Sequence, residues 1–231
     1  LLERNKAKIV LQGTTHLQSF NTDTDLTYRS ITPGVRDEYR ESDTMQFSET
    51  PTAICTTHPK QGMSWLLDLW SNKIQPNVIN AELHIYSATF KRAQDNGEVA
   101  DDLLPIWEKI INGKDKGIKI ISPAGDNDMA KQYRYASVHL YPGSDKEMYC
   151  STLAESQAVG VPAVARPLGA VKERIVDCQT GFLAAEEDEF VKHAIMMLSD
   201  FEQREAISKS ARRYGTARSW DTVAREFETL F

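Results

Sequence analysis

The chain has 231 residues, of which 41% are hydrophobic and 26% charged, enough to bury a substantial core and unlike a disordered, collagen-like or coiled-coil chain. Its 33 acidic and 27 basic residues leave a formal net charge of -6, so the surface repels a phosphate backbone and we expect no nucleic-acid partner. The longest apolar run, residues 158–165, is far shorter than the roughly 20 residues of a membrane span, and no charged-then-apolar leader opens the chain. We therefore expect a cytoplasmic protein.

The first 50 residues contain one strand-like run at residues 8–11 and a turn at Pro33 and Gly34. A polar stretch from residue 36 to 52 follows, and its composition is typical of a linker. Because Leu1 is not Met and a strand is already under way at residue 8, we expect the chain to be a fragment of a longer protein.

From residue 52 onward, short β-branched or aliphatic runs alternate with longer amphipathic stretches, which is the pattern of strand-helix units on a parallel sheet. The predicted strands span residues 52–56, 82–87, 118–122, 138–141, 162–165 and 182–184. The predicted helices between them span residues 63–72, 99–111, 127–136, 151–159 and 170–176. On the first of these helices, Trp65, Leu66, Leu69 and Trp70 form a packing stripe. The sequence predicts an α/β fold with a doubly wound parallel sheet.

After residue 184 the strand-like runs stop, and three predicted helices at residues 188–198, 202–214 and 219–231 finish the chain. In the first of them, Phe190, Ala194 and Leu198 recur at the helical period, so one face packs and the other is solvated. We expect a helical carboxyl-terminal end.

The cysteines Cys55, Cys150 and Cys178 are odd in number and form no CxxC pair. They predict neither a disulfide framework nor a cysteine zinc site, and we expect reduced thiols in the core. Asp126 and Asp128 have only a superficial similarity to an Asp-x-Asp metal motif, and we expect them to cap the helix that follows.

The segment from Tyr141 to Glu155 lies between a predicted strand and a predicted helix. Ligands of open α/β sheets collect beyond the carboxyl ends of the strands, so this loop is placed to bind one. Ser151 or Thr152 is suited to cap the helix, and the unpaired amides of its first turn form an anion site with the positive end of the helix dipole. The sequence predicts that a phosphate binds here.

Two glutamates flank this helix start. Glu155 lies four residues after Ser151, on the same helix face and about 6 Å further along the axis at a rise of roughly 1.5 Å per residue. At that distance its carboxylate can accept hydrogen bonds from the ribose of a bound nucleotide, while Glu147, before the helix, could accept them from a second sugar. The alternative, that both are solvated glutamates like most in proteins, remains open on spacing alone.

The pattern Glu147-x7-Glu155 continues into Ala-Val-Gly-Val-Pro-Ala-Val-Ala and then, from Gly169, into Gly-Ala-Val-Lys-Glu-Arg-Ile-Val-Asp-Cys-Gln-Thr-Gly-Phe-Leu. This combination resembles the carboxyl-terminal, sugar-donor-binding half of GT-B fold retaining glycosyltransferases of family 4 (group 1). The likeness extends from about residue 52 to the final helix at Ser219 and Trp220.

The resemblance implies a Rossmann-like donor domain over residues 51–231. It also implies that residues 1–50 are the remnant of an amino-terminal acceptor domain together with a hinge, here Thr32-Pro33-Gly34-Val35. The rest of that amino-terminal domain would then be missing from the chain.

The resemblance also assigns roles to individual residues. In the family, the first glutamate contacts hydroxyls of the transferred sugar and the second contacts the nucleotide ribose, which carries these roles to Glu147 and Glu155. The amides of Cys150, Ser151 and Thr152 match the diphosphate-binding helix start of the family.

The family further places a basic pair near a Lys-Gly after the first strand of this domain, where the charges stabilise the leaving diphosphate. Here the segment is Cys55-Thr-Thr-His-Pro-Lys-Gln-Gly, so the usual Arg is absent and Lys60 is displaced by one position from the usual Lys. Lys60 is the catalytic candidate, and His58 is a candidate for binding the sugar donor that could equally be a structural hydrogen-bonding residue.

The function implied by the resemblance is a retaining hexosyltransferase that transfers a sugar from a nucleoside-diphosphate sugar to a glycan or lipid-linked acceptor. Polysaccharide or glycolipid synthesis, no metal or other cofactor, and a cytoplasmic location that could be peripheral to the inner face of a membrane are implied with it. The alternative is a non-catalytic nucleotide-sugar-binding or regulatory module, because without an amino-terminal domain the acceptor would not be positioned for transfer.

Overall fold

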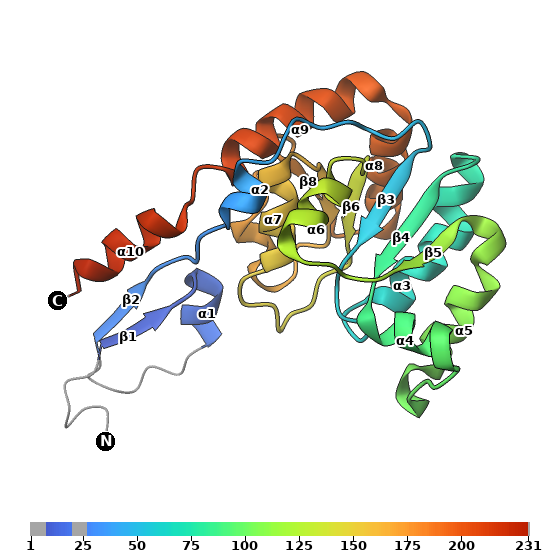
Figure 1. The fold of residues 1–231 in the computed structure, drawn as a ribbon, viewed down its shortest axis with the longest axis horizontal. Coiled ribbons are helices and arrows are strands. Elements are labelled where there is room, and N and C mark those ends of the chain that lie inside the picture. Colours follow the sequence, from blue (N-terminus) through green and yellow to red (C-terminus); the bar gives the residue numbers. More distant parts are fainter. Residues whose placement is uncertain (1–7, 20–26, 231) are drawn as a thin grey trace.

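The structure, a computed structural model, describes residues 8–19 and 27–230. Its main sheet has six parallel strands in the order β5-β4-β3-β6-β7-β8 (Figure 1). These strands are β3 (Thr52–Cys55), β4 (Glu82–Tyr86), β5 (Ile118–Ile121), β6 (Val138–Tyr141), β7 (Ala163–Ala165) and β8 (Gly181–Leu183). The predicted strands 52–56, 82–87, 118–122, 138–141, 162–165 and 182–184 are therefore confirmed, with ends that differ by at most one residue.

The strand order contains a topological switch point. The chain runs outward from β3 through β4 to β5, returns to β6 beside β3, and then runs outward the other way through β7 to β8. The loops that follow β3 and β6 therefore start next to each other and lead to opposite halves of the sheet. In open α/β sheets this is where ligands bind.

Helices cover both faces of the sheet, because residues on its strands alternate between two cores. On β3, Ala53 and Cys55 join one core and Ile54 joins the other. The helices of the doubly wound part are α3 (Met63–Leu69), which continues as a π-helical stretch (Trp70–Ile74), α4 (Ala88–Asn96), α5 (Leu104–Asn112), α6 (Asp126–Tyr133) and α7 (Ser151–Val159). This confirms the predicted doubly wound α/β fold.

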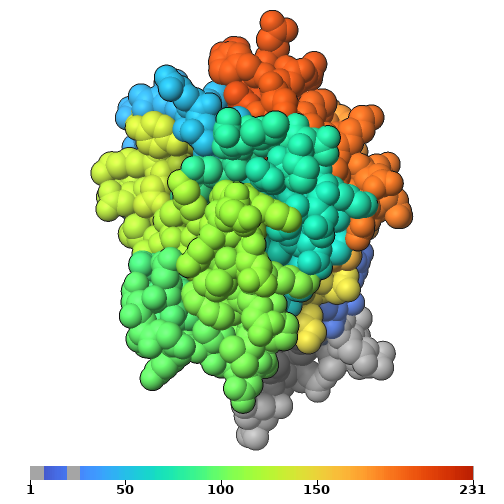
Figure 2. All heavy atoms as spheres, turned by 90° about the vertical axis from the view of Figure 1, so that its right-hand side faces the viewer, coloured from blue at the N-terminus to red at the C-terminus, as the bar shows by residue number. Residues whose placement is uncertain are grey.

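Three helices, α8 (Glu187–Ser199), α9 (Phe201–Gly215) and α10 (Trp220–Glu228), follow the last strand, as predicted. Figure 2 shows the β5 side of the molecule, with the segments around α4 and α5, in green, at the lower front and the carboxyl-terminal helices, in orange, at the top. None of the helices in the described part of the chain combines the length and apolar character that a membrane crossing requires.

The amino-terminal part forms a small separate layer. Two parallel strands, β1 (Lys8–Leu11) and β2 (Thr27–Ser30), flank the short helix α1 (Thr14–Ser19) along the chain. These elements and α10 lie to one side of the main sheet (Figure 1). A small apolar cluster of Ile31, Val223 and Leu230, with Val10 packed against it, joins the layer to α10.

Several local predictions need correction. The helix α4 was not predicted, because only Phe90 and Ala93 of its residues are buried and the apolar period is weak. The predicted helix at 170–176 is a 3-10 helix, Gly169–Glu173. The prediction that all three cysteines lie in the core is wrong for Cys178, which is exposed.

The stretch predicted as a linker, residues 36–52, packs against the main body over its first turn. It contains the short helix α2 (Asp37–Arg40), whose Tyr39 is buried and lies in the same apolar core as α6 and α7. Tyr39 donates a hydrogen bond to Asp126 (2.8 Å), and Arg36 forms an ion pair with the same carboxylate. The prediction that Asp126 caps α6 is wrong, since the N-cap is Gly125 and Asp126 is engaged by these two residues.

Candidate functional site

The loops after β3 and β6 contact each other at the switch point. Gly62, the last residue of the β3 loop, has a left-handed backbone (φ 77°), and a Cβ there would lie 2.8 Å from the Cβ of Pro142 in the β6 loop. Only glycine fits this conformation and this approach without strain. The contact brings the β3 loop beside the segment that leads to α7.

Helix α7 begins at Ser151, as predicted, but its N-cap is Cys150. This residue has left-handed backbone angles (φ 60°, ψ 56°) and makes no side-chain capping hydrogen bond. The prediction that Ser151 or Thr152 caps the helix is wrong: Ser151 is the first helical residue, and the Thr152 hydroxyl accepts a hydrogen bond from Thr56 (2.8 Å). Among the described residues no side chain accepts from the first-turn amides, so these donors and the positive end of the helix dipole can face an anion.

A buried hydrogen-bond chain supports this turn from below. His139 on β6 is fully buried, its Nε2 lies 3.0 Å from the Thr56 hydroxyl and its Nδ1 lies 2.7 Å from the Ser156 hydroxyl on α7. Burial lowers the pKa of His139 to about 3, so the ring is neutral. Thr56 donates to the Thr152 hydroxyl, which leaves the Thr152 hydroxyl hydrogen for a ligand, while the Ser156 hydroxyl, beside His139, donates to the Leu153 carbonyl (3.1 Å).

Glu155 lies one turn further along α7, beside α6 and α2. Burial, and after it the nearby Asp126 carboxylate, raises the pKa of Glu155 to about 7, while the Arg36 guanidinium acts in the opposite direction. Its carboxyl group is therefore partly protonated near neutral pH, and it can both accept hydrogen bonds from a ligand hydroxyl and donate one.

Glu147 lies before α7 in the β6 loop. Its Oε2 is buried and has no hydrogen-bond partner among the described residues. The main chain is fixed nearby, because the Ala170 amide donates to the Glu147 carbonyl (2.9 Å) and Gly169, with φ 53°, lies so close that a Cβ would be 2.6 Å from that oxygen. A buried carboxylate oxygen without a partner is costly, and a ligand hydroxyl would satisfy it.

Within the part of the chain that the structure describes, Lys60 and His58 make no hydrogen bond or ion pair with the start of α7. Lys60 forms an ion pair with Asp102, whose pKa is lowered by the hydrogen bond from this lysine, and both side chains are more than half exposed. His58 is exposed and its Nδ1 accepts from the Lys60 amide (3.2 Å), which is the structural role left open for it. The β3 loop reaches α7 through Thr56 instead.

Thr56 and His139 are functional candidates that the sequence prediction missed. The available signal was weak: His139 stands between Val138 and Leu140 in a strand that is buried at every position, where a polar side chain needs a partner. Nothing in the local sequence shows that this partner is Thr56, 83 residues earlier in the chain.

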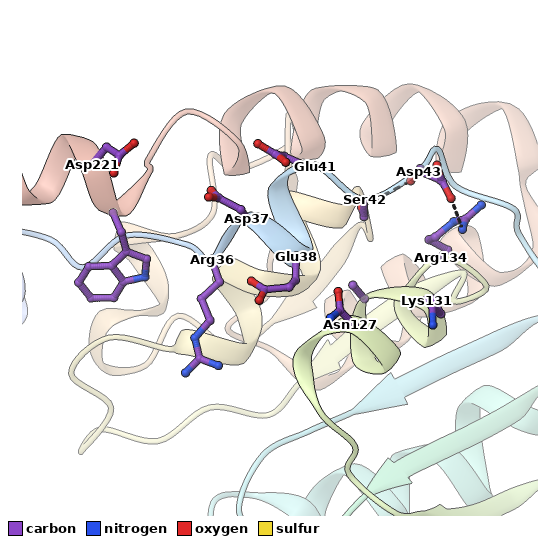
Figure 3. Close-up of a pocket in the computed structure, with 12 residues that line it drawn as sticks. Arg36, Asp37, Glu38, Glu41, Ser42, Asp43, Asn127, Lys131, Arg134 and Asp221 are labelled. Atoms are coloured by element: carbon purple, nitrogen blue, oxygen red, sulfur yellow. Dashed lines mark hydrogen bonds and ion pairs between the residues drawn. The ribbon is translucent and has the colours of Figure 1, made fainter.

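A cavity of about 690 Å³ lies beside α2, where α6 and the start of α10 approach it (Figure 3). Its lining carries Asp37 and Glu38 of α2 and Glu41 directly after it, and an ion pair joins Asp43 to Arg134. Of the predicted site residues none lines this cavity. The candidate site is therefore the uncapped start of α7 with Glu147 and Glu155, and not this cavity.

Comparison with known proteins gives a consistent result. Residues 51–200 match the family described as glycosyl transferases group 1. The chain is 27% identical over 176 residues, 74% of its length, to the lipopolysaccharide 1,2-N-acetylglucosaminetransferase of Salmonella typhimurium, and covers 44% of that protein. It is 31% identical over 105 residues, 42% of its length, to the GDP-mannose-dependent alpha-mannosyltransferase of Mycolicibacterium smegmatis, and covers 26% of that protein.

Solved structures share the fold at low sequence identity. Sucrose-phosphate synthase from Thermosynechococcus elongatus superposes with a TM-score of 0.78 at 14% identity, over 99% of this chain and 60% of that one. Anabaena HepE in complex with UDP and glucose superposes with a TM-score of 0.74 at 15% identity, over 97% of this chain and 63% of that one. The chain spans less than half the length of the curated relatives described above.

Proposed function

Because the chain belongs to the glycosyl transferases group 1 family, we propose that it binds a nucleoside-diphosphate sugar at the start of α7 as the donor half of a retaining family 4 hexosyltransferase. In this proposal residues 51–231 are the donor domain, and residues 1–50 are a hinge and the remnant of an acceptor domain whose remainder is missing here. The acceptor is a glycan or a lipid-linked glycan in polysaccharide or glycolipid synthesis.

The observation that carries the proposal is the uncapped first turn of α7. The amides of Cys150, Ser151 and Thr152 would bind the diphosphate, and the free hydrogen of the Thr152 hydroxyl adds a fourth donor. These groups are fixed before a ligand arrives, since Thr56 and His139 hold the turn from below. Preorganised donors of this kind stabilise the negative charge that grows on a leaving diphosphate.

The two glutamates supply the contacts on either side. Glu147 offers to hydroxyls of the transferred sugar a buried oxygen that has no partner in residues 8–19 and 27–230, and Glu155 is one helical turn further along for the ribose. No metal is needed for these contacts, and the absence of a metal cofactor stays a prediction. The names of the relatives support a nucleotide-linked sugar donor, since one is GDP-mannose-dependent and a structural neighbour was solved with UDP and glucose.

One observation favours the second candidate function, a nucleotide-sugar-binding module without transferase activity. Lys60, the predicted catalytic cation, is held by Asp102 rather than at the start of α7. To stabilise the leaving diphosphate, Lys60 would have to exchange this ion pair for the phosphate, and a module that only binds the sugar donor has no such requirement.

Isothermal titration with UDP, GDP and ADP tests the binding site. We expect one of the three nucleotides to bind. Glu155→Ala should weaken the affinity for that nucleotide at least about tenfold, because the variant loses hydrogen bonds between the ligand and the carboxylate. Glu108→Ala is the matched control, because Glu108 is exposed on α5 and its removal should leave affinity unchanged. If none of the nucleotides binds, both functions are wrong.

Hydrolysis or transfer of the sugar donor separates the two functions. The assay is run on this chain alone and on the chain joined to, or mixed with, an amino-terminal acceptor domain. Turnover with the acceptor domain, and retention of configuration in the product, support the transferase; nucleotide binding without turnover in either form supports the binding module. Transfer assayed with vesicles of anionic lipid tests the proposed peripheral membrane association.

A further inference from the structure

The chain crosses between the small amino-terminal layer and the main body twice, and the two crossings lie side by side (Figure 1). The first crossing, residues 32–35, is called the crossing segment below. Its Val35 amide donates to the Arg218 carbonyl (2.9 Å), in the second crossing, and Val35 forms a β-bridge with Ser219. Gly34 is required here, because a Cβ would lie 2.7 Å from the Trp220 amide nitrogen.

Side chains of the main body and of the second crossing hold three consecutive carbonyls of the crossing segment. Arg218 donates to the Thr32 carbonyl from Nε (3.0 Å) and Nη2 (2.7 Å). The Tyr149 hydroxyl donates a hydrogen bond that is shared between the carbonyls of Pro33 and Gly34, both 3.2 Å away. Tyr149 belongs to the β6 loop and stands between Glu147 and the N-cap of α7.

Packing fixes the crossing segment at Val35, which is buried in the apolar core shared with α6 and α7, but not at Thr32 and Pro33, which are only partly buried. A cavity of about 480 Å³ is lined by Pro33 and Val35 on one side and by Ala154 and Gln157 of α7 on the other. Because this space is not filled by side chains, dispersion contacts across it are lost. The hydrogen bonds from Tyr149 and Arg218 therefore hold residues 32–34, whereas Val35 is held by packing.

Arg174 fixes Tyr149 at both its main chain and its ring. The Arg174 Nε donates to the Tyr149 carbonyl (2.8 Å), and the guanidinium carbon lies 4.4 Å from the ring centroid. Arg174 is only 9% exposed, and its Nη2 has no partner among the described residues. Burying a guanidinium with an unpartnered nitrogen is unfavourable, and its contact with the Tyr149 ring offsets part of this free energy. The contact therefore restrains the ring.

The conformation of Cys150, the residue after Tyr149, depends on how firmly Tyr149 is anchored. Cys150 adopts a left-handed backbone that a residue with a Cβ enters at a cost of about 1 kcal/mol or more. Such a conformation persists only when its surroundings impose it, and Tyr149 is the preceding anchored residue. A movement of Tyr149 would therefore turn the peptide groups whose amides face the phosphate site.

From these contacts we infer that Tyr149 is a positioning residue that couples occupancy of the nucleotide site to the position of the crossing segment. The inference rests on the proposed function, since it describes regulation of the same site. A diphosphate bound to the preformed start of α7 would suppress the remaining motion of Cys150 and Tyr149, and through the Tyr149 hydroxyl it would suppress opening of residues 32–35 as well. Thermodynamic linkage makes the effect reciprocal, so a fixed crossing segment tightens nucleotide binding by the same factor.

Hydrogen exchange of the amides of residues 34–36, with and without the nucleotide identified by titration, measures this coupling. We expect the nucleotide to slow exchange at these amides at least about fivefold, the lower end of typical coupling between sites. In Tyr149→Phe, which keeps the ring and removes only the shared hydrogen bond, the slowing should fall below about twofold and affinity should weaken by no more than the coupling factor. Tyr135→Phe, at an exposed tyrosine in the turn after α6, should behave as wild type.

A second variant separates positioning from folding. Arg174→Lys keeps the charge but removes the guanidinium over the Tyr149 ring and the Nε donor. We expect it to reduce the nucleotide-dependent slowing of hydrogen exchange. The melting temperature in the absence of nucleotide should stay within a few degrees of wild type. Equal slowing of exchange in wild type and Tyr149→Phe would show that the inference is wrong while the proposed function stands. Absence of nucleotide binding to the wild-type chain would overturn both.

Discussion

The two loops that meet at the switch point differ in how far their charged groups are already engaged. After β3, the cation Lys60 is exposed and paired with Asp102. After β6, the Glu147 carboxylate has a buried oxygen that no described residue contacts by a hydrogen bond, and none of them caps the first turn of α7 with its side chain. An exposed ion pair contributes little and is easily exchanged, whereas buried unsatisfied groups are costly and call for a ligand. The β6 loop is thus the preformed half of the site and the β3 loop the adaptable half.

The largest effect should come from Gly169, which holds the preformed half in place. Gly169→Ala adds a Cβ 2.6 Å from the carbonyls of Glu147 and Ser144 at a φ of 53°, so we expect the free energy of unfolding to fall by about 3 kcal/mol and nucleotide affinity to fall more than about tenfold. Urea unfolding and isothermal titration measure the two effects.

Two other glycines separate the causes of this loss. Gly97→Ala has the same kind of backbone (φ 78°) but open space for the Cβ, so it should cost only about 1 kcal/mol of strain. Gly125→Ala has neither a positive φ nor a neighbour within 4 Å, so it should show only the modest cost, about 0.5 to 1 kcal/mol, of Ala at the N-cap of α6. If all three variants lose the same stability and the same affinity, the close approach of Gly169 to the β6 loop has no special role.

The second-largest effect should come from Glu155, because burying its carboxylate in the preformed half lowers the free energy of unfolding at neutral and higher pH. Burial, followed by Asp126, raises the pKa of Glu155 from 4.5 to about 7, so between these values the folded chain holds a proton that the unfolded chain has released. The contribution of Glu155 to stability therefore falls as the pH rises from 4.5 to 7. Glu155→Gln cannot ionise, and at pH 8 we expect it to exceed wild type in stability by on the order of 1 to 2 kcal/mol, with a much smaller difference at pH 4.5.

Urea unfolding of wild type and variant at the two pH values measures this difference, and Glu108→Gln is the exposed control. A stability difference that does not change with pH would mean that Glu155 is solvated like an ordinary surface glutamate. That result would favour the alternative interpretation of its spacing from Glu147.

The fold and the preformed half were largely predictable from the sequence. Strands such as Val138–Tyr141 are buried at every position, so an apolar run alone identifies them. The start of α7 at Ser151 was predicted from the helix-like run that follows this strand. The spacing of Glu147 and Glu155 in the sequence then placed one acid before the helix start and the other one turn after it. Each of these features depends on a short segment of the chain, so the residue pattern of that segment is enough to predict it.

The features that were missed depend on distant partners. The N-cap of α7 is Cys150, which makes no side-chain cap, and the preceding Tyr149 is held at its carbonyl by Arg174, 25 residues away. Tyr39 is buried in a stretch of linker-like composition because α6 and α7 supply its neighbours. The engagement of Lys60 by Asp102, 42 residues away, is equally invisible in the β3 loop itself. Tertiary contacts decide these cases, and a single sequence does not contain them.

The smallest effect should come from the adaptable half. Asp102→Asn releases Lys60, and if this lysine then reaches the diphosphate, nucleotide affinity should rise about two- to threefold, as expected for one exposed charge in a screened setting. Asp68→Asn is the matched control, because it removes one acid and breaks the exposed pair with Lys109 on the same side of the sheet, so it reports the effect of net charge alone. Lys60→Gln in the Asp102→Asn background should abolish the gain. A gain that survives Lys60→Gln, or one that Asp68→Asn reproduces, would remove Lys60 from the site and leave the β6 loop to hold the ligand alone.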